Sequence, residues 1–470
     1  MIRSALLCMP LCVLLVPLAW GQEEGPQRPL GLTQQAPPAA GEVSEPDERS
    51  ADALTLDEAI ALALRQNRLV KNAALEVEKA GDQIAATKTL RLPQFDVSVT
   101  PAYTVTPLDV TFQRGVFGTF AATGPIPPAE TTLHTDPQYS TAARATVSQP
   151  VSQLYKLGLA IDQLEVSRDV SRQDLRAQRQ STVSRVKRAY YAVLQAQSGL
   201  EALREQVGAS RELVRVVADQ VGQQAALRAD LLQARAGLAQ AEYAVTAARH
   251  DLASRREQLN HLLGRSPDTP LRVSAVPPAI PSQMDVDLAR EVALRQRPEI
   301  ARAGLEVSHA DYGVRLKKAE FIPDVSLVFQ YLAPITSDVL PRNIAYVGVQ
   351  INWDVWDWGR KNDDLALRRR TLDQAKNAVA EATSRVILDV NAAFRRLEDS
   401  QAYLAVAELN RDAAREKFRV ITHQYREQAA LLQDVLVAQA ALGQTSDQYR
   451  QAVLSVWEAR AEFERALGGE

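Results

Sequence analysis

The side chains that most often carry catalysis or bind metal ions are scattered along this sequence. Its five histidines show neither metal-ligand spacing nor a catalytic partner close by, namely His134, His250, His261, His309 and His423. No phosphate-binding P-loop is present. Met284 is the only methionine after residue 21, which argues against a thioether copper relay. The sequence therefore predicts no enzyme, no cofactor and no metal centre, and its function must depend on how its elements are built.

The composition allows a large folded body, since 46% of the 470 residues are apolar and 24% are charged. The first 21 residues resemble a secretory signal, with Arg3 before a short apolar run and small residues at Ala19 and Gly21. Without this segment the formal net charge changes only from −3 to −4, which gives no electrostatic case for nucleic-acid binding.

Both cysteines, Cys8 and Cys12, lie inside the predicted signal. We therefore expect a mature protein without disulfides or a lipid anchor. Residues 22–53 are rich in Pro, Gly, Gln and Glu and are predicted to form a disordered leader. No later stretch reaches 18 uninterrupted apolar residues, so no transmembrane helix is expected.

The rest of the chain repeats itself once. The segment "LALRQNRLVKNAALEV" (62–77) returns 230 positions later as "VALRQRPEIARAGLEV" (292–307). A second segment, "AALRADLLQARAGL" (225–238), returns 204 positions later as "AALLQDVLVAQAAL" (429–442). A repeat unit of about 200 residues that fills the chain twice indicates a duplicated half rather than a solenoid.

The repeat defines the predicted organisation of the chain. Residues 54–263 form the first half and residues 285–468 the second, joined by the Pro-rich linker 264–284. The two offsets differ by 26, so the first half carries an insertion between Pro93 and about residue 147. Each half is predicted to run helix, helix, strand, strand, very long helix, long helix, with breaks at Asn67 and before Pro298.

Four segments change from helical to alternating periodicity, at about 93–106, 139–150, 323–332 and 344–355. In the first of them, Phe95, Val97 and Val99 alternate with polar residues, which is typical of strands with one apolar face. Alternation alone is compatible with a half-buried antiparallel sheet in a soluble domain.

The long helical segments carry a strict heptad repeat. Apolar residues recur at every seventh position from Val186 to Val221, and the pattern returns from Val390 onwards. Five or six consecutive heptads indicate knobs-into-holes packing. A helix over residues 157–222 would be roughly 100 Å long, which a compact domain does not need.

Together these features resemble the TolC-type outer-membrane efflux proteins. The resemblance covers Leu54 to Gly468 and is carried by the duplicated "ALRQN"/"ALRQRP" motif and by three further segments: "SQPVSQLYKLG" (148–158), "INWDVWDWGRK" (351–361) and "YREQAALLQDVLVAQ" (425–439). It implies a fold of long antiparallel coiled-coil helices with four transmembrane β-strands per chain. Three chains would form one twelve-stranded outer-membrane barrel above a periplasmic α-helical tunnel. Four strands alone leave two open edges, which lipid does not tolerate.

The resemblance also implies partners and a location. They are outer-membrane lipid, a periplasmic adaptor (membrane fusion protein) and an inner-membrane pump of RND, ABC or MFS type, in a Gram-negative-type cell. The channel would conduct small molecules or other cargo passively. An alternative from another class is an exported coiled-coil scaffold without channel activity.

The resemblance places a gate at the helix tips. Tyr425 matches a tip tyrosine, Asp230 the acid on the neighbouring hairpin to which it bonds, and Asp434 an acid whose three copies ring the narrowest point. Such a ring would favour cations. Several family positions differ, with Val437 in place of a second ring acid, Ala430 and Ala229 in place of an arginine–threonine tie, and Gln224 and Gln428 in place of tip glycines. Considered alone, without the resemblance, Asp230 and Asp434 are better explained as solvated charges on a coiled coil.

Two further groups of residues follow from the resemblance. The tips that would dock the adaptor comprise Gln224, Ala225, Leu227, Gln428, Ala429 and Leu431. Trp353, Trp356 and Trp358 would lie in an aromatic girdle at the membrane interface, the alternative being ordinary core tryptophans. Residues 107–138 and 333–344 would form the larger and the smaller extracellular loop.

Overall fold

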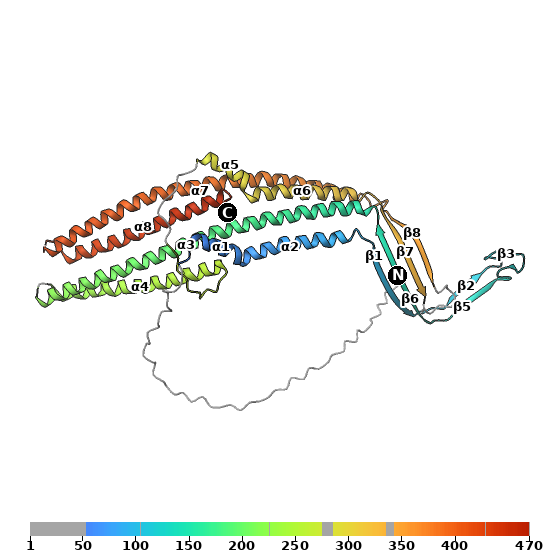
Figure 1. Cartoon of the computed structure of the whole chain (residues 1–470), viewed down its shortest axis with the longest axis horizontal. Coiled ribbons are helices and arrows are strands. Elements are labelled where there is room, and N and C mark those ends of the chain that lie inside the picture. Colours follow the sequence, from blue (N-terminus) through green and yellow to red (C-terminus); the bar gives the residue numbers. More distant parts are fainter. Residues whose placement is uncertain are drawn as a thin grey trace, which may run out of the picture. The chain divides into compact units, whose positions relative to one another are not determined.

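A computed structural model describes residues 53–103, 105–224, 226–274, 285–334, 343–427 and 429–469. The predicted signal, most of the predicted leader, residues 275–284 of the linker, residues 335–342 of the smaller loop, Ala225 and Gln428 lie outside the described residues. The helices are α1 (Leu56–Gln66), α2 (Arg68–Thr89), α3 (Gln153–Gly222), α4 (Arg228–Leu263), α5 (Val286–Gln296), α6 (Pro298–Ala319), α7 (Arg360–Arg426) and α8 (Leu432–Ala466) (Figure 1). The strands are β1 (Gln94–Tyr103), β2 (Leu108–Phe112), β3 (Thr119–Phe120), β4 (Gly124–Pro125), β5 (Thr131–Thr135), β6 (Tyr139–Pro150), β7 (Asp324–Pro334) and β8 (Ile344–Asn352).

The helix breaks have local causes. Asn67 ends α1 in an extended conformation, and its side-chain oxygen accepts the backbone N–H of Leu69 at 2.9 Å as the cap of α2. In the second half Pro298 occupies the first turn of α6, where its missing N–H has no intrahelical partner to lose. Both breaks lie where the sequence predicts them.

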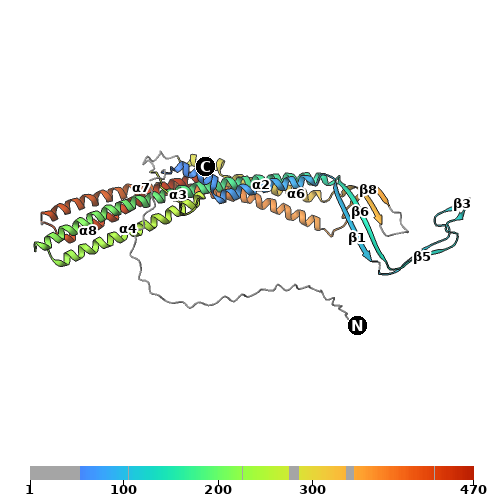
Figure 2. The same cartoon turned by 60° about the horizontal axis from the view of Figure 1, so that its bottom comes forward.

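The four longest strands form one antiparallel sheet in the order β1-β6-β7-β8. Each strand adjoins a helix along the chain, and the helices pack side by side in the matching order α2-α3-α6-α7. Figure 2 shows the strands of this sheet leaving one end of the helical layer. The sheet therefore continues, strand by strand, into a layer of helices.

The strand register follows the internal repeat. Gln94 pairs with Ser148 in β1–β6. The residues 230 and 204 positions further on, Asp324 and Asn352, pair in the same way in β7–β8. The two hairpins of the sheet are thus equivalent residue by residue, and β6–β7 is the contact between the two halves.

This register separates the sheet into two faces. One face joins apolar side chains across all four strands, such as Phe95, Val147, Phe329 and Val347 in one row. The other joins polar side chains, including Asp96, Thr146 and Gln330. The apolar face is open in the single chain, with Phe95 76% and Val347 69% exposed. Within one chain this sheet is not the half-buried sheet of a soluble domain.

The insertion 107–138 has more structure than the loop expected from the sequence. It contains two short antiparallel ladders, β2–β5 and β3–β4. Alternation in "LDVTF" and "TTLHT" supports the longer ladder, in which the hydroxyl oxygens of Thr111 and Thr132 lie 3.0 Å apart. His134 lies opposite Asp109 in the same ladder and forms an ion pair with it.

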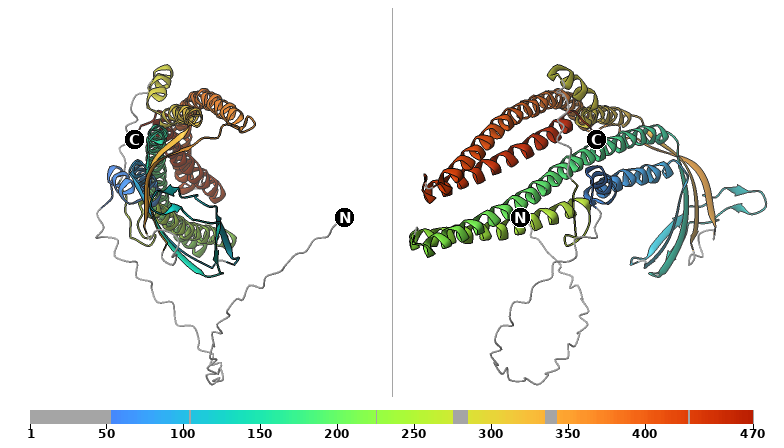
Figure 3. Two further views of the ribbon diagram at one scale, coloured as in Figure 1. Left: turned by 90° about the vertical axis from the view of Figure 1, so that its right-hand side faces the viewer. Right: turned by 60° about the vertical axis from the view of Figure 1, so that its left-hand side comes forward.

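The long helices form two antiparallel hairpins, α3–α4 and α7–α8 (Figure 3). Helix α3 alone has 70 residues, which corresponds to roughly 105 Å. The predicted heptad positions Val186, Val193, Leu200 and Val207 are buried, as are Val390 and Leu397 in α7. Heptad packing therefore holds each hairpin together.

The two copies of the duplicated "ALRQN"/"ALRQRP" motif occupy equivalent places. A Cβ atom built at Gly264 would lie 2.5 Å from the carbonyl oxygen of Gln66, and one at Gly468 would lie 3.0 Å from the carbonyl carbon of Gln296. Beside them, the Asn67 side chain donates to the carbonyl of Leu262 at 2.8 Å, and Arg297 donates to that of Arg465 at 3.2 Å. The duplicated motif thus forms the same contact in each half of the chain. In the first half the end of the short helix α1 docks on the end of α4, and in the second half the end of α5 docks on the end of α8.

Candidate functional site at the helix tips

The hairpin tips are short turns between Gly222 and Arg228 and between Arg426 and Leu432. Gln224 adopts a left-handed conformation with φ of 61°. A side chain in this region costs about 1–2 kcal/mol relative to glycine. The backbone at position 224 thus has a conformation that favours glycine, the residue that the resemblance implies at this position.

Asp230 and Asp434 have the same local role in the two tips. Each carboxylate accepts the backbone N–H three residues earlier, from Leu227 and Leu431 respectively, at 3.0 Å. A negative charge at a helix N-terminus is favourable because it meets the positive end of the helix dipole. Asp230 is half-buried and Asp434 is exposed.

Tyr425 ties the two hairpins together. Its hydroxyl donates to the side-chain oxygen of Gln220 on α3 at 2.8 Å. Burial raises the pKa of this hydroxyl and the charge of Asp230 raises it further, against the opposing effect of the Gln220 bond. The hydroxyl therefore stays protonated and able to donate at neutral pH.

The resemblance implies Asp230 as the partner of Tyr425, whereas within this chain the Tyr425 hydroxyl donates to Gln220. The carboxylate of Asp230 is bonded to its own helix, although its charge reaches the tyrosine. The repeat contains a signal for this contact. At the offset of 204, Tyr425 on α7 is equivalent to Val221 on α3, so it lies at the same distance from the hairpin tips as Val221 and its neighbour Gln220.

Further polar contacts join the same two hairpins along their length. Lys187 forms an ion pair with Glu464 at 2.6 Å, and its side chain is only 18% exposed. Nearer the tips, Gln439 and Ser210 are 3.5 Å apart. Of these three contacts between α3 and the second hairpin, the Tyr425–Gln220 bond lies nearest the tips.

The three predicted girdle tryptophans follow the last strand. Trp353, Trp356 and Trp358 are 58%, 75% and 88% exposed, so none is buried in the core of the single chain. The rings of Trp356 and Trp358 meet edge to face with centroids 5.8 Å apart.

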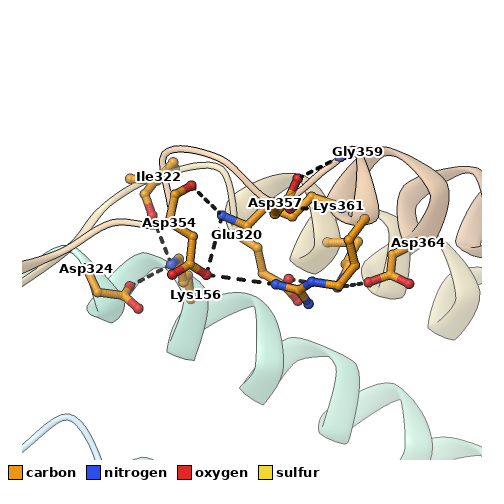
Figure 4. A network of polar contacts seen from close by, with 11 residues as sticks. Lys156, Glu320, Ile322, Asp324, Asp354, Asp357, Gly359, Lys361 and Asp364 are labelled. Carbon is orange, nitrogen blue, oxygen red and sulfur yellow. Dashed lines mark hydrogen bonds and ion pairs between the residues drawn. The ribbon is translucent and has the colours of Figure 1, made fainter. Parts of the chain in front are cut away.

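A polar network fixes the junctions between strands and helices (Figure 4). Lys156 at the start of α3 pairs with Asp324 of β7 at 2.6 Å and donates to the carbonyl of Ile322 at 3.0 Å. The buried Lys361 donates to the carbonyl of Asp354 at 3.2 Å. These lysines lie inside the motifs 148–158 and 351–361, but sequence reasoning assigned them no role.

The polar face of the sheet meets this network at a cavity of about 610 Å³. Its walls combine strand residues of the polar face with charged helix residues: Gln94, Ser148, Asp324, Ser326, Lys156 and Lys317. Lys317 is itself paired with Glu320 and Asp364 at 2.7 and 2.8 Å. The cavity is therefore lined by charges of both signs.

Among the described residues, no group of three or more His, Cys, Asp or Glu side chains is arranged to hold a metal ion. In the same part of the chain, no helix has the length and apolarity needed to cross a membrane.

The sequence matches the family of outer membrane efflux proteins over residues 59–265 and 289–469. The outer membrane efflux protein BepC of Brucella suis biovar 1 (strain 1330) is 29% identical over 247 residues, which cover 51% of this chain and 52% of BepC. The match thus spans about half the length of this relative.

Solved structures share the fold at low sequence identity. The Campylobacter jejuni CmeC outer membrane channel has a TM-score of 0.70 and 18% identity, covering 88% of this chain and 85% of its own. The Neisseria gonorrhoeae MtrE outer membrane channel in its open state has a TM-score of 0.67 and 17% identity, covering 88% and 89%. Since the family match covers both halves of the duplicated sequence, this chain belongs to the outer membrane efflux protein family.

Proposed function

We propose that this protein is the outer-membrane channel of a tripartite efflux or secretion system and conducts cargo passively to the cell exterior. The observation that carries the proposal is the four-stranded sheet, with one open apolar face, one polar face and two open edges, that continues into a layer of long helices. Lipid requires an apolar surface and a sheet without free edges. A homotrimer that closes twelve strands into a barrel satisfies both requirements.

In this arrangement the long helices form a periplasmic tunnel. Its tips face a periplasmic adaptor, which connects the channel to an inner-membrane pump of RND, ABC or MFS type. The adaptor would contact Gln224, Ala225, Leu227, Gln428, Ala429 and Leu431. Trp353, Trp356 and Trp358 would lie at the membrane interface, while residues 107–138 and 333–344 face the exterior.

The proposal is tested by reconstituting the purified protein in planar lipid bilayers and by fractionating cells. We expect discrete conductance steps and recovery of heat-labile trimers only after detergent extraction of the outer membrane. A water-soluble protein without conductance would instead identify an exported coiled-coil scaffold.

Replacing Tyr425 by phenylalanine should raise the single-channel conductance. The substitution removes the hydroxyl bond to Gln220, a neutral hydrogen bond that contributes about 0.5–1.5 kcal/mol to holding the two hairpins of each chain together near their tips. Gln220→Leu should act similarly, and the double variant should add little to either single change because both remove one tie.

The matched control for this experiment is Tyr403→Phe, because Tyr403 lies on the same helix and is 50% exposed. It should leave the conductance unchanged. Asp230→Ala is a less specific test, since it also removes the cap of α4. Equal conductance of Tyr425→Phe and the native protein would show that the tips are not held by this bond.

Asp434→Asn should lower the cation-to-anion permeability ratio several-fold. Asparagine keeps a side-chain oxygen for the N–H of Leu431 while removing the charge, and three such charges would meet at the trimer axis. Asp230→Asn is the control, because it changes the equivalent cap of the other hairpin. If the reversal potential in a salt gradient moved only with Asp230→Asn, the selective ring would belong to the first hairpin.

A further inference from the structure

The cavity of about 610 Å³ between the polar face of the sheet and the helices is separate from the helix tips. Its volume lies within the range that is typical of pockets for small molecules. Part of its lining is apolar, with Leu90, Leu157 and Leu316, and the rest is polar or charged. A mixed lining of this kind suits a small amphipathic molecule.

Most of the charges in this lining are already paired within the chain. Lys156 forms an ion pair with Asp324 at 2.6 Å (Figure 4). Lys317 is paired with Glu320 at 2.7 Å and with Asp364 at 2.8 Å. The two lysine side chains are only 19% and 14% exposed. These ion pairs therefore hold the junction together and leave no free charge for a ligand.

Arg368 on α7 is the exception among the charged residues that line the cavity. It is exposed, and within the described part of the chain its guanidinium forms neither a hydrogen bond nor an ion pair. Its charge still reaches Asp364, whose pKa is lowered mainly by the hydrogen bond from Lys317 and further by the charges of Arg360 and Arg368. All N–H donors of this guanidinium are thus open to a ligand.

Four neutral polar side chains share the cavity with Arg368. They come from three strands and from α3, and they are Gln94, Ser148, Ser326 and Gln153. In the described residues none of these four side chains forms a hydrogen bond. Amide and hydroxyl groups can donate to an oxyanion beside a guanidinium. The polar part of the cavity therefore combines one unpaired cation with neutral donors that have no internal partner.

The internal repeat distinguishes Arg368 from the cations that belong to the fold. At the offset of 204, Lys156 of α3 corresponds to Arg360 of α7, so both halves carry a cation at the start of the long helix. Arg368 corresponds to Leu164, and its guanidinium has no counterpart in the first half. The architecture shared by the two halves thus does not require a cation at position 368.

We propose that this cavity binds a small amphipathic organic anion, with the anionic group on Arg368 and the apolar body against Leu157 and Leu316. Guanidinium groups bind carboxylate, phosphate and related oxyanions through paired hydrogen bonds. The inference rests on the proposed channel and names a class of cargo, because the polar face of the sheet would line the lumen that cargo crosses. Since cargo must also leave, the site should bind reversibly and weakly.

Isothermal titration calorimetry of the purified full-length protein in detergent tests the site, with naphthalene-1-sulfonate as the probe. The sulfonate supplies the oxyanion and the fused rings supply the apolar body. After subtraction of the heats measured with empty micelles, we expect saturable binding of one anion per chain, because the cavity lies within a single chain. A site on a trimer axis would instead bind one anion per three chains.

Substitutions on α7 provide a matched set. Arg368→Gln should weaken binding about ten-fold or more, because it removes charge-assisted hydrogen bonds. Arg368→Lys keeps the charge but loses the paired geometry, so it should weaken binding to a smaller extent. Arg369→Gln is the control, since Arg369 is the next residue on the same helix, is exposed and does not line the cavity. It should leave the affinity unchanged.

Inorganic sulfate tests whether the apolar part of the ligand contributes. Sulfate carries the oxyanion without an apolar body, so it should displace naphthalene-1-sulfonate only at concentrations several-fold higher than those of the probe. Equal affinity for the two anions would overturn the assignment of an amphipathic ligand. Binding to Arg368→Gln as tight as to the native protein would overturn the site.

Conductance measured on the same preparations in planar bilayers separates the two proposals. A protein that conducts but does not bind naphthalene-1-sulfonate through Arg368 overturns the site and leaves the channel standing. A protein that binds the anion through Arg368 without conducting supports the site and overturns the channel.

Discussion

Leu327→Lys should strongly reduce the amount of heat-labile trimer recovered from the outer membrane. Leu327 belongs to the apolar face of the sheet, opposite Val349, and is 48% exposed in the single chain. If that face meets lipid, as proposed, a lysine there costs roughly 2–4 kcal/mol per chain near the bilayer midplane. Because each of the three chains carries this cost, the free energy of trimer assembly should change more than the stability of the sheet in one chain.

The neighbouring residue provides the control at the same depth. Ser326 lies on the polar face and lines the cavity at the junction. Ser326→Lys should therefore leave most of the trimer intact, as judged by gel mobility with and without heating. Equal losses from both substitutions would mean that the sheet faces have been assigned to the wrong environments.

Gly264→Ala should produce the largest loss of stability among the small substitutions. The residue has φ of 77°, and its added Cβ would lie 2.5 Å from the carbonyl oxygen and 2.8 Å from the carbonyl carbon of Gln66. The left-handed conformation costs alanine about 1–2 kcal/mol, and relief of the overlap with the backbone adds about 1–3 kcal/mol. Thermal unfolding in detergent, followed by circular dichroism at the helical band, measures the effect.

Gly237→Ala is the matched substitution inside α4, the helix whose C-terminal end Gly264 caps. Gly237 lies within α4, and a Cβ there meets nothing within 4 Å. Alanine should stabilise this position by roughly 0.5–1 kcal/mol, because glycine is unfavourable inside a helix. The two variants should thus shift the midpoint of unfolding in opposite directions. Shifts of the same sign and size would show that α1 does not dock against the end of α4.

The long helices, the four main strands and their order follow from the sequence alone, whereas the short strands of the insertion 107–138 do not. Periods of 3.6 and 2 residues separated helices from strands, and Asn67 and Pro298 marked the helix breaks, because these are local properties of the backbone. The alternation in the strands also identified the two faces, since side chains on one strand must point to opposite sides. The duplication and the family resemblance were equally visible, and both halves match the family.

Which residues of different elements contact one another depends on the tertiary structure and cannot be predicted from the sequence patterns. Gln66 lies in the repeated motif 62–77 and Gly264 follows α4, but no periodicity predicts their contact, in which a Cβ built at Gly264 would lie 2.5 Å from the carbonyl oxygen of Gln66. Likewise, the repeat predicts how far Tyr425 lies from the hairpin tip. Its hydrogen bond to Gln220, however, depends on how each helix is rotated about its own axis. The carboxylate of Asp230 had a nearer donor in its own backbone, at Leu227. Local patterns constrain the chain one element at a time, while a contact between elements also requires their relative rotation and register, which only packing determines.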